Sequence, residues 1–408
     1  MKPVASLENV RFEAGPNARG EFQASARLAV KSPEPWLIQS YLETASAVRG
    51  APAEFLGLPK DIRSAGYEYG MPDARAASLQ SAIVQLAKTA LGEYGSPSSR
   101  LGSKLKPAEA RTMDRVVSEL VRMLDSPCFR ASRSVWAGGA GGPMPTKQPF
   151  AMDAVLRSAV GYYLVATPSA SRCDAFIGSV LDTIDAVYKA LPAKDRREFP
   201  VSLSLRKATK LPGLTDATAY RMTLSKAALR ELFDKSRKKL DAAEQAKKTQ
   251  WAPPQAALTL TLYVLPNANG TGSDWFAFGL DEKPMKAALA QLFHPTPGHT
   301  LASQPALAPF LAKNPLSLSY GTFLWQWQLF QSLMGSEDAA LSLLAGLFNG
   351  LTVTTTTQVL RRGAGSEATL DYTVSPEGLN ALRTLLGWDL ERLEKMFGEI
   401  EKAAEEKQ

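Results

Sequence analysis

The chain has 408 residues, of which 45% are hydrophobic, 21% charged and 8% aromatic. This composition is that of a globular protein, and it excludes a disordered chain, a collagen-like repeat and a small domain held together by disulfides. The formal net charge is +7, but the distribution of charge along the chain is more informative than its total.

A recurring local unit is the most informative feature of the sequence: an alternating strand, a helix-start signal and an amphipathic helix. It first occurs at residues 22–30, where apolar side chains alternate as on a half-buried strand. Ser32 is expected to accept hydrogen bonds from the first-turn amides, and Pro33 and Glu34 suit the first turn of a helix. Residues 36–42 then carry the apolar stripe.

The same unit returns further along the chain, most clearly near the C-terminus. Residues 369–374 alternate again, and Ser375, Pro376 and Glu377 predict a second helix start of the same kind. Looser copies begin at residues 219 and 258, and weaker ones at residues 66, 161 and 316. Because the spacing is irregular, a solenoid of fixed period is not supported.

These units predict an α+β fold with two related lobes of largely antiparallel sheet, each covered on one face by amphipathic helices. We place the boundary near residue 195, giving an N-terminal lobe of residues 1–195 and a C-terminal lobe of residues 196–408. The glycine-rich residues 138–145 are interpreted as a loop within the first lobe. The second lobe is expected to end in an amphipathic helix with Leu390, Leu393, Phe397 and Ile400 on one side.

Positive charge is concentrated in residues 221–248, which hold nine basic and four acidic side chains. Such a helix face is usually only solvated, but it could bind a polyanion. The candidate basic patch is Lys235, Arg237, Lys238 and Lys239. Nucleic acid is an unlikely partner.

The two cysteines, Cys128 and Cys173, could form a disulfide in an oxidising compartment or stay as two buried thiols in a reducing one. A zinc site is not expected, because the cysteines form no Cys-x-x-Cys pair and the two histidines lie far away in the chain. Both histidines, His294 and His299, fall in a proline-broken loop, where no helix presents them together.

No catalytic motif is present. The run from Ser204 to Lys207 matches Ser-x-x-Lys, but residues 202–206 alternate like a strand, on which positions three apart face opposite sides. The glycines at 138–142 lead into prolines and not directly into a helix, as a phosphate loop requires. We therefore expect neither catalytic residues nor a metal or cofactor site, and predict that the protein is not an enzyme.

The most unusual local feature of the sequence is a cluster of aromatic residues at positions 323–330. On a helix, Trp325 and Trp327 lie about 200° apart, so both faces of the segment must be occupied. One interpretation is a helix sandwiched within the core, and the other is an exposed apolar groove that recognises a partner. The candidate binding residues are Phe323, Trp325, Trp327 and Phe330.

Two segments of the chain resemble a loosely defined group of bacterial envelope proteins, often lipoproteins, that are built from repeated strand–helix units. They are residues 275–281 followed by 286–289, and residues 369–379. The resemblance implies an exported, periplasmic or envelope protein, but the sequence as given shows neither a signal peptide nor a lipidated cysteine near its start. Without such a signal the expected location is the cytoplasm.

The leading hypothesis is a non-enzymatic binding or scaffold protein of the bacterial envelope that recognises a protein or lipid partner. The alternative is a carrier of a lipid or other hydrophobic ligand in an apolar cavity, and the third is polyanion binding through the basic helix. No run of about 18 apolar residues occurs, so no transmembrane helix is expected.

Overall fold

A computed structural model gives the fold of most of the chain. It describes residues 7–32, 34–95, 118, 121–122, 125–139, 149–190, 201–206, 217–238, 251–267, 270–322 and 352–376.

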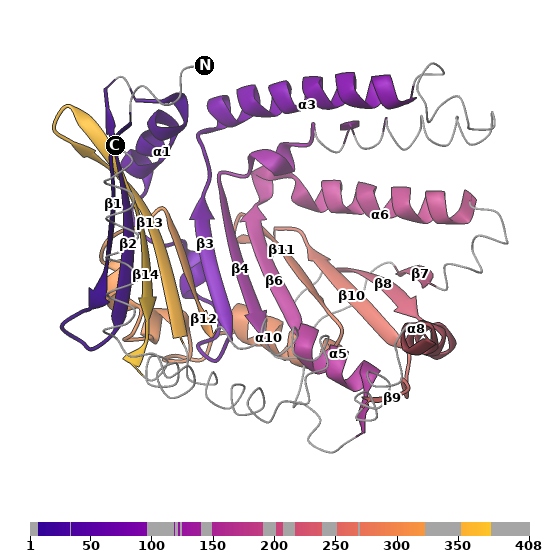
Figure 1. Cartoon of the computed structure of the whole chain (residues 1–408). Coiled ribbons are helices and arrows are strands. Elements are labelled where there is room, and N and C mark those ends of the chain that lie inside the picture. Colours follow the sequence, from indigo (N-terminus) through magenta and orange to yellow (C-terminus); the bar gives the residue numbers. More distant parts are fainter. Residues whose placement is uncertain are drawn as a thin grey trace.

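One twelve-stranded antiparallel sheet organises the described residues (Figure 1). The direction of the strands turns steadily across the sheet, which is the usual twist of extended backbones. In spatial order its strands are β1 (Leu7–Pro16), β2 (Phe22–Lys31), β14 (Gly365–Val374), β13 (Thr352–Arg362), β12 (Ser317–Thr322), β3 (Ser64–Tyr69), β4 (Arg133–Gly139), β6 (Tyr162–Pro168), β11 (Ser273–Gly279), β10 (Leu258–Leu265), β8 (Thr218–Leu224) and β7 (Val201–Arg206). Two short strands, β5 (Phe150–Ala151) and β9 (Trp251–Ala252), form a separate parallel pair.

Helices follow many of these strands. The α-helices are α1 (Trp36–Ala47), α2 (Ala53–Leu56), α3 (Asp73–Gly95), α5 (Met152–Val160), α6 (Cys173–Ala190), α8 (Lys226–Lys238), α10 (Glu282–Phe293) and α11 (Ala308–Leu311). Single 3₁₀ turns occur at η2 (Pro127–Arg130), η3 (Ser169–Ser171) and η6 (Leu301–Ser303). No helix in the described part of the chain is both long and apolar enough to span a bilayer.

The predicted α+β class with a largely antiparallel sheet is confirmed. The strand at residues 22–30 is present as β2, and the hairpin and helix predicted from residue 258 onward are β10, β11 and α10. Asp281 caps α10, since its side chain accepts a hydrogen bond from the amide of Lys283 (3.1 Å). The histidines lie in the loop that follows, because α10 ends at Phe293.

Two local predictions are wrong. Helix α1 begins at Trp36 after Pro35, which has no side chain to bond the first-turn amides, so Ser32 is not its cap. Gly138 and Gly139 belong to strand β4 and not to a loop, because they pair with β3 and β6. Neighbouring side chains occupy the space that a Cβ atom would need, which explains the glycines. A Cβ at Gly139 would overlap the ring of Tyr162.

Strands from the two ends of the chain are neighbours in the sheet. β14 pairs with β2, β12 with β3, and β11 with β6, so residues on both sides of position 195 hydrogen-bond to each other. The β1–β2 hairpin therefore lies beside the β13–β14 hairpin. The predicted division into two domains stays a prediction, as does the C-terminal helix, which lies outside the described residues.

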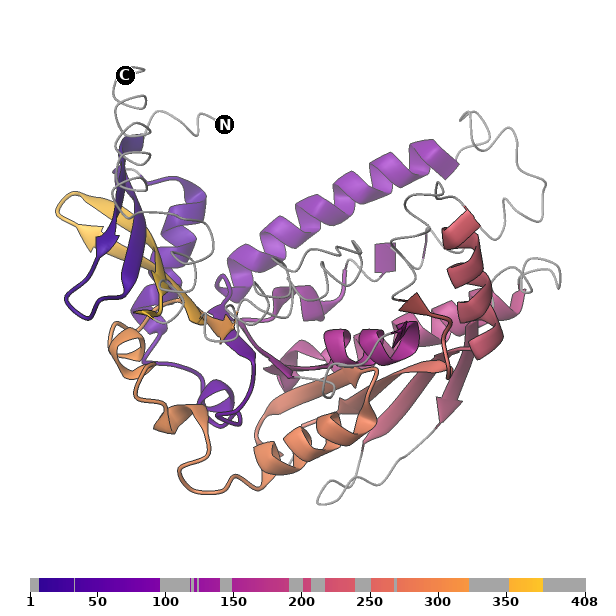
Figure 2. The same cartoon turned by 60° about the horizontal axis from the view of Figure 1, so that its bottom comes forward.

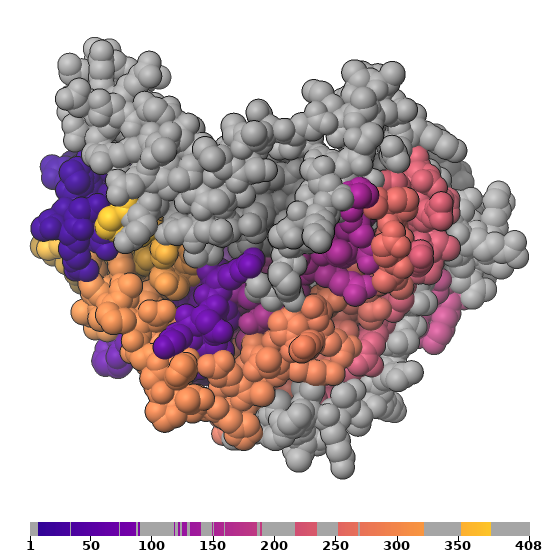
Figure 3. Space-filling model, turned by 90° about the horizontal axis from the view of Figure 1, so that it is seen from below, coloured from indigo at the N-terminus to yellow at the C-terminus, as the bar shows by residue number. Residues whose placement is uncertain are grey.

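The main core lies between one face of the central strands and the elements α2, α10, η6 and α11. Tyr67, Leu164 and Ala277 contribute from the sheet, and Met285 and Leu289 from α10. Figure 2 shows α10, in orange, against the strands it follows. The segment after α2 also pairs with the segment after α10, and Figure 3 shows these purple and orange residues in contact.

A second cluster lies on the opposite face of the central strands. Phe276 follows Trp275 and precedes Ala277 along β11, so its side chain points away from the main core. There it packs near Ile177 of α6 and the two cysteines, Cys128 and Cys173. The central strands are thus covered on both faces.

The pairing of β14 with β2 can be tested at Gly365. A Cβ added there would overlap the backbone carbonyl oxygen of Val30, which cannot move without disturbing the ladder. We expect Gly365→Ala to lower the free energy of unfolding by about 1–3 kcal/mol, measured by denaturant titration. Gly15→Ala is the control, because open space surrounds its Cβ position; equal losses in both variants would contradict the tight approach of β14 to β2.

Candidate functional site

The described structure contains a carboxylate that is surrounded by four hydrogen-bond donors. Glu282 is the first residue of α10 and points toward strands β8 and β10. Its Oε1 accepts hydrogen bonds from Arg221 Nε and Thr261 Oγ1, both at 2.9 Å. Its Oε2 accepts one from the hydroxyl of Tyr263 (2.9 Å) and contacts Lys286 Nζ (2.8 Å).

Local structure brings these five residues together. Thr261 and Tyr263 are two apart on β10, so both side chains lie on the face that α10 covers. Arg221 pairs directly with Thr261 on the neighbouring strand, and Lys286 lies one helical turn after Glu282. The position of Glu282 at the start of the helix also places its negative charge at the positive end of the helix dipole.

The electrostatics follow from this geometry. Burial raises the pKa of Glu282, but the hydrogen bonds from Arg221, Lys286, Thr261 and Tyr263 outweigh it and lower the pKa to about 2. The hydrogen bond to Glu282 raises the pKa of Lys286, and burial raises the pKa of Tyr263. Near neutral pH the group therefore consists of a carboxylate, two cations and a protonated phenol.

This arrangement is suited to holding α10 on the sheet. A carboxylate offers about four acceptor positions, and all four are occupied. Glu282 is consequently too weak a base to take up a proton near neutral pH, and Tyr263 and Lys286 hold theirs more firmly than usual. We call these five residues the Glu282 anchor.

A second carboxylate, whose side chain is 8% exposed, has a similar role. Glu54 of α2 forms an ion pair with Arg133 of β4, and the Ser273 hydroxyl of β11 donates to the same carboxylate oxygen. Its other oxygen has no partner in the described structure. This contact ties α2 to two strands of the sheet, on the side of the main core.

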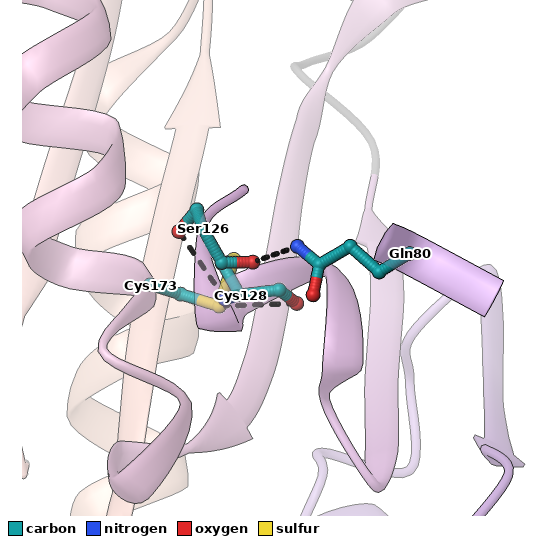
Figure 4. The surroundings of a disulfide bond; sticks show 4 residues. All are labelled: Gln80, Ser126, Cys128 and Cys173. Carbon is teal, nitrogen blue, oxygen red and sulfur yellow. Dashed lines mark hydrogen bonds between the residues drawn. A yellow bond between two sulfur atoms is a disulfide. The ribbon is translucent and has the colours of Figure 1, made fainter. Parts of the chain in front are cut away.

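A disulfide bond joins Cys128 of η2 to Cys173 at the start of α6 (Figure 4). Ser126 Oγ accepts from the amide of Cys128 (3.3 Å), and Gln80 of α3 donates to the Ser126 carbonyl oxygen (2.8 Å). Cys173 is buried against the sheet in the second cluster. The disulfide thus joins η2 to the start of α6 beside the sheet. Of the two cysteine states that the sequence allows, the structure contains the disulfide.

The described structure does not test the candidate binding residues predicted from the sequence. Phe323, Trp325, Trp327 and Phe330 lie outside the described residues, as does Lys239. Lys235, Arg237 and Lys238 belong to the last turn of α8, where the structure does not describe their side chains. The two histidines are exposed, and no group of three metal-binding side chains occurs among the described residues.

Sequence reasoning missed the Glu282 anchor. Its signal was present, since Thr261 and Tyr263 alternate on a predicted strand and Glu282 and Lys286 are four apart on the predicted helix. What joins them is the packing of α10 on β10 and β8, which a single sequence does not reveal.

The chain matches no protein-family model, no curated protein sequence and no solved structure at a significant level. Arguments about function therefore depend on the geometry of the chain itself.

The Glu282 anchor predicts a pH-dependent loss of stability. We expect Glu282→Gln to lower the free energy of unfolding by about 1–3 kcal/mol at neutral pH, because it removes the charge that accepts four hydrogen bonds. The folded-state pKa is about 2 and the ordinary value is 4.5, so the stabilisation is present above pH 4.5 and is lost as the pH falls through 2.

Denaturant titrations of the wild type and the variant between neutral pH and pH 2 test this, and the difference between them should shrink below pH 4.5. Glu43→Gln is the control, since Glu43 is half exposed in its ion pair with Arg75. The control should change stability by less than about 1 kcal/mol. A pH-independent difference for Glu282→Gln would refute the low pKa.

Removal of the disulfide should destabilise the protein. The cysteines are 45 residues apart, and closing a loop of that length restricts the unfolded chain by about 4 kcal/mol. We expect the Cys128→Ser and Cys173→Ser double variant to lose about 2–4 kcal/mol of unfolding free energy. The same loss should follow treatment of the wild type with a reductant, which should leave the double variant unchanged. Free thiols titrating in the native, untreated protein would overturn the assignment.

Proposed function

We propose that this chain is a non-enzymatic binding or scaffold protein of the bacterial envelope. The Cys128–Cys173 disulfide is the observation that carries the proposal. Structural disulfides persist in oxidising compartments such as the bacterial periplasm and are rare in reducing cytosol. The resemblance of residues 275–281 and 369–379 to repeated strand–helix envelope proteins supports the same location, and the two related lobes predicted from those repeats belong to the proposal.

The state of the Glu282 anchor supports a non-enzymatic role. Catalytic carboxylates usually have a pKa near the working pH or a position open to substrate. Glu282 has its pKa lowered to about 2 and has four donors around it. In this proposal the group fixes the sheet surface and takes no part in a reaction.

The stripe of apolar side chains on α3 supports the binding role. Leu79, Ile83 and Leu86 recur at four- and three-residue steps, so they lie along one side of the helix. Their exposed fractions are 40%, 47% and 70%, although Gln80 and Val84 of the same helix are buried. We call these three residues the α3 stripe.

A protein partner fits the α3 stripe better than a membrane surface does. Over its whole length α3 carries two acidic and two basic residues, so it has no net charge to attract anionic lipid. One of its two cations, Arg75, is already in an ion pair with Glu43. A partner that presents an amphipathic helix would match the spacing of the stripe. The aromatic residues 323–330 remain in the proposal as a second apolar contact.

The α3 stripe can be tested by site-specific photo-crosslinking in living cells. A photoreactive residue at position 83 or 86 should give one discrete protein adduct, and the same residue at position 81 or 85 should give none. Ser81 and Gln85 are also exposed on α3 but belong to its polar side. Leu79→Asp combined with Leu86→Asp should abolish the adduct from position 83, with Thr89→Asp as the matched control.

The outcomes separate the alternatives. Equal crosslinking from both sides of α3 would refute the stripe as a binding surface. Adducts with lipid, together with cosedimentation of the purified chain with anionic vesicles, would favour a membrane partner instead. Circular dichroism of each variant verifies that the fold is retained.

A further inference from the structure

We propose that two copies of this chain associate through the free edge of β1, in antiparallel register with Phe12 on the twofold axis. The proposal depends on the exposed side chains of β1 and not on the α3 stripe.

Strand β1 is an open edge of the sheet. Among the described strands it pairs with β2 only, so no described strand lies on the other side of its backbone. Residues 7–13 are all exposed, and they include Leu7 (44%), Val10 (39%) and Phe12 (53%). An exposed edge strand that carries three large apolar side chains favours pairing with another strand.

The regular part of β1 sets the length of such a pairing. The register between β1 and β2 shifts between Leu7 and Asn9, so the strand is irregular at Glu8. At the other end, Pro16 has no amide hydrogen to donate. Between these limits lies a regular segment whose middle is close to Phe12.

Side-chain direction restricts the possible registers. A twofold axis perpendicular to the sheet keeps each face of the sheet on the same side in both copies. Residues that lie opposite each other in antiparallel strands point to the same face. One residue must therefore lie directly opposite its own copy across the axis. Near the middle of the strand the candidates for this position are Val10, Arg11, Phe12 and Glu13.

Charge complementarity selects one of these four registers. An axis at Arg11 or Glu13 would place like charges opposite each other, which is destabilising. An axis at Val10 would oppose Leu7 to Glu13 and use the irregular end of the strand. An axis at Phe12 places Arg11 opposite Glu13 of the second copy, twice. On the other face of the sheet it places the two Phe12 rings opposite each other.

The ion pairs already present agree with this register. Arg11 Nη1 lies 3.8 Å from Glu13 Oε1 of its own strand, and Arg27 Nη2 of β2 lies 3.2 Å from Glu13 Oε2. Arg11, Glu13 and Arg27 thus share one face of the sheet, whereas Val10, Phe12 and Ala14 share the other. In the paired state Glu13 would lie between its own Arg27 and Arg11 of the second copy.

A charge-reversal experiment on the full chain tests the inference. Sedimentation velocity should show a dimer of the wild type that dissociates on dilution. Arg11→Glu or Glu13→Arg alone should raise the dissociation constant about tenfold or more, because each puts two like-charged pairs opposite each other. An equimolar mixture of the two variants should dimerise again, because every opposing pair then has opposite charges.

A single added cysteine tests the register independently. Phe12→Cys should form a disulfide-linked dimer under mild oxidation, since position 12 faces itself across the axis. Ala14→Cys is the control, because position 14 would face Val10 of the second copy and not itself. Circular dichroism of every variant verifies its fold, so that loss of the dimer is not loss of structure.

Three results would overturn the inference. The first is a wild type that stays monomeric at every concentration, and the second is a dimer that the charge reversals do not affect. The third is a mixture of the two reversed variants that does not recover. Crosslinking through position 14 but not position 12 would refute the register.

Discussion

The antiparallel pairing of β14 with β2 is the contact on which the rest of the structure depends. A two-stranded hairpin is marginally stable in water unless further strands or helices cover it. The strand beside the β1–β2 hairpin comes from residues more than 300 positions later in the chain. Strand β3 likewise pairs with β12, which is distant in the sequence. Through these contacts a sequence of local strand–helix units becomes one continuous sheet.

Buried and half-buried carboxylates hold other elements on this sheet. Glu282 holds the start of α10 against β8 and β10, and Glu54 holds α2 against β4 and β11. Asp371 of β14 does the same for β2 and the segment before β12, through Ser25 and Lys313. Each carboxylate joins segments that are distant in the chain, so these charges stabilise the packing of the described elements on the sheet.

Sequence reasoning was most successful where local signals agree. At residues 258–293 the alternation of a strand, the turn residues, a capping Asp and a helical stripe all predict the β10–β11–α10 unit that the structure contains. It was least successful where burial depends on a distant neighbour. Strand β13, with its run of threonines, and strand β4, with its two glycines, lack a clear apolar alternation and are defined by the strands on either side.

The order of strands in the sheet could likewise not be predicted from the sequence, because no local property of residues 365–374 identifies residues 22–31 as their partner. The same limit applies to the Glu282 anchor. The spacing of Thr261 and Tyr263 places them on one face of a strand, but their shared acceptor is determined only when a helix from the next unit packs on that face.

The chain-end pairing has a consequence for biosynthesis. A ribosome releases the N-terminal hairpin first, yet the strand that must lie beside it leaves the ribosome among the last described segments. For most of translation that hairpin would lack the strand that pairs with β2, in addition to the strand that could pair with β1. Contacts between residues so far apart in the chain form slowly, and strands that are still unpaired can aggregate until these contacts form. The β1–β2 hairpin therefore gains its neighbouring strand only after residues 365–374 have been synthesised.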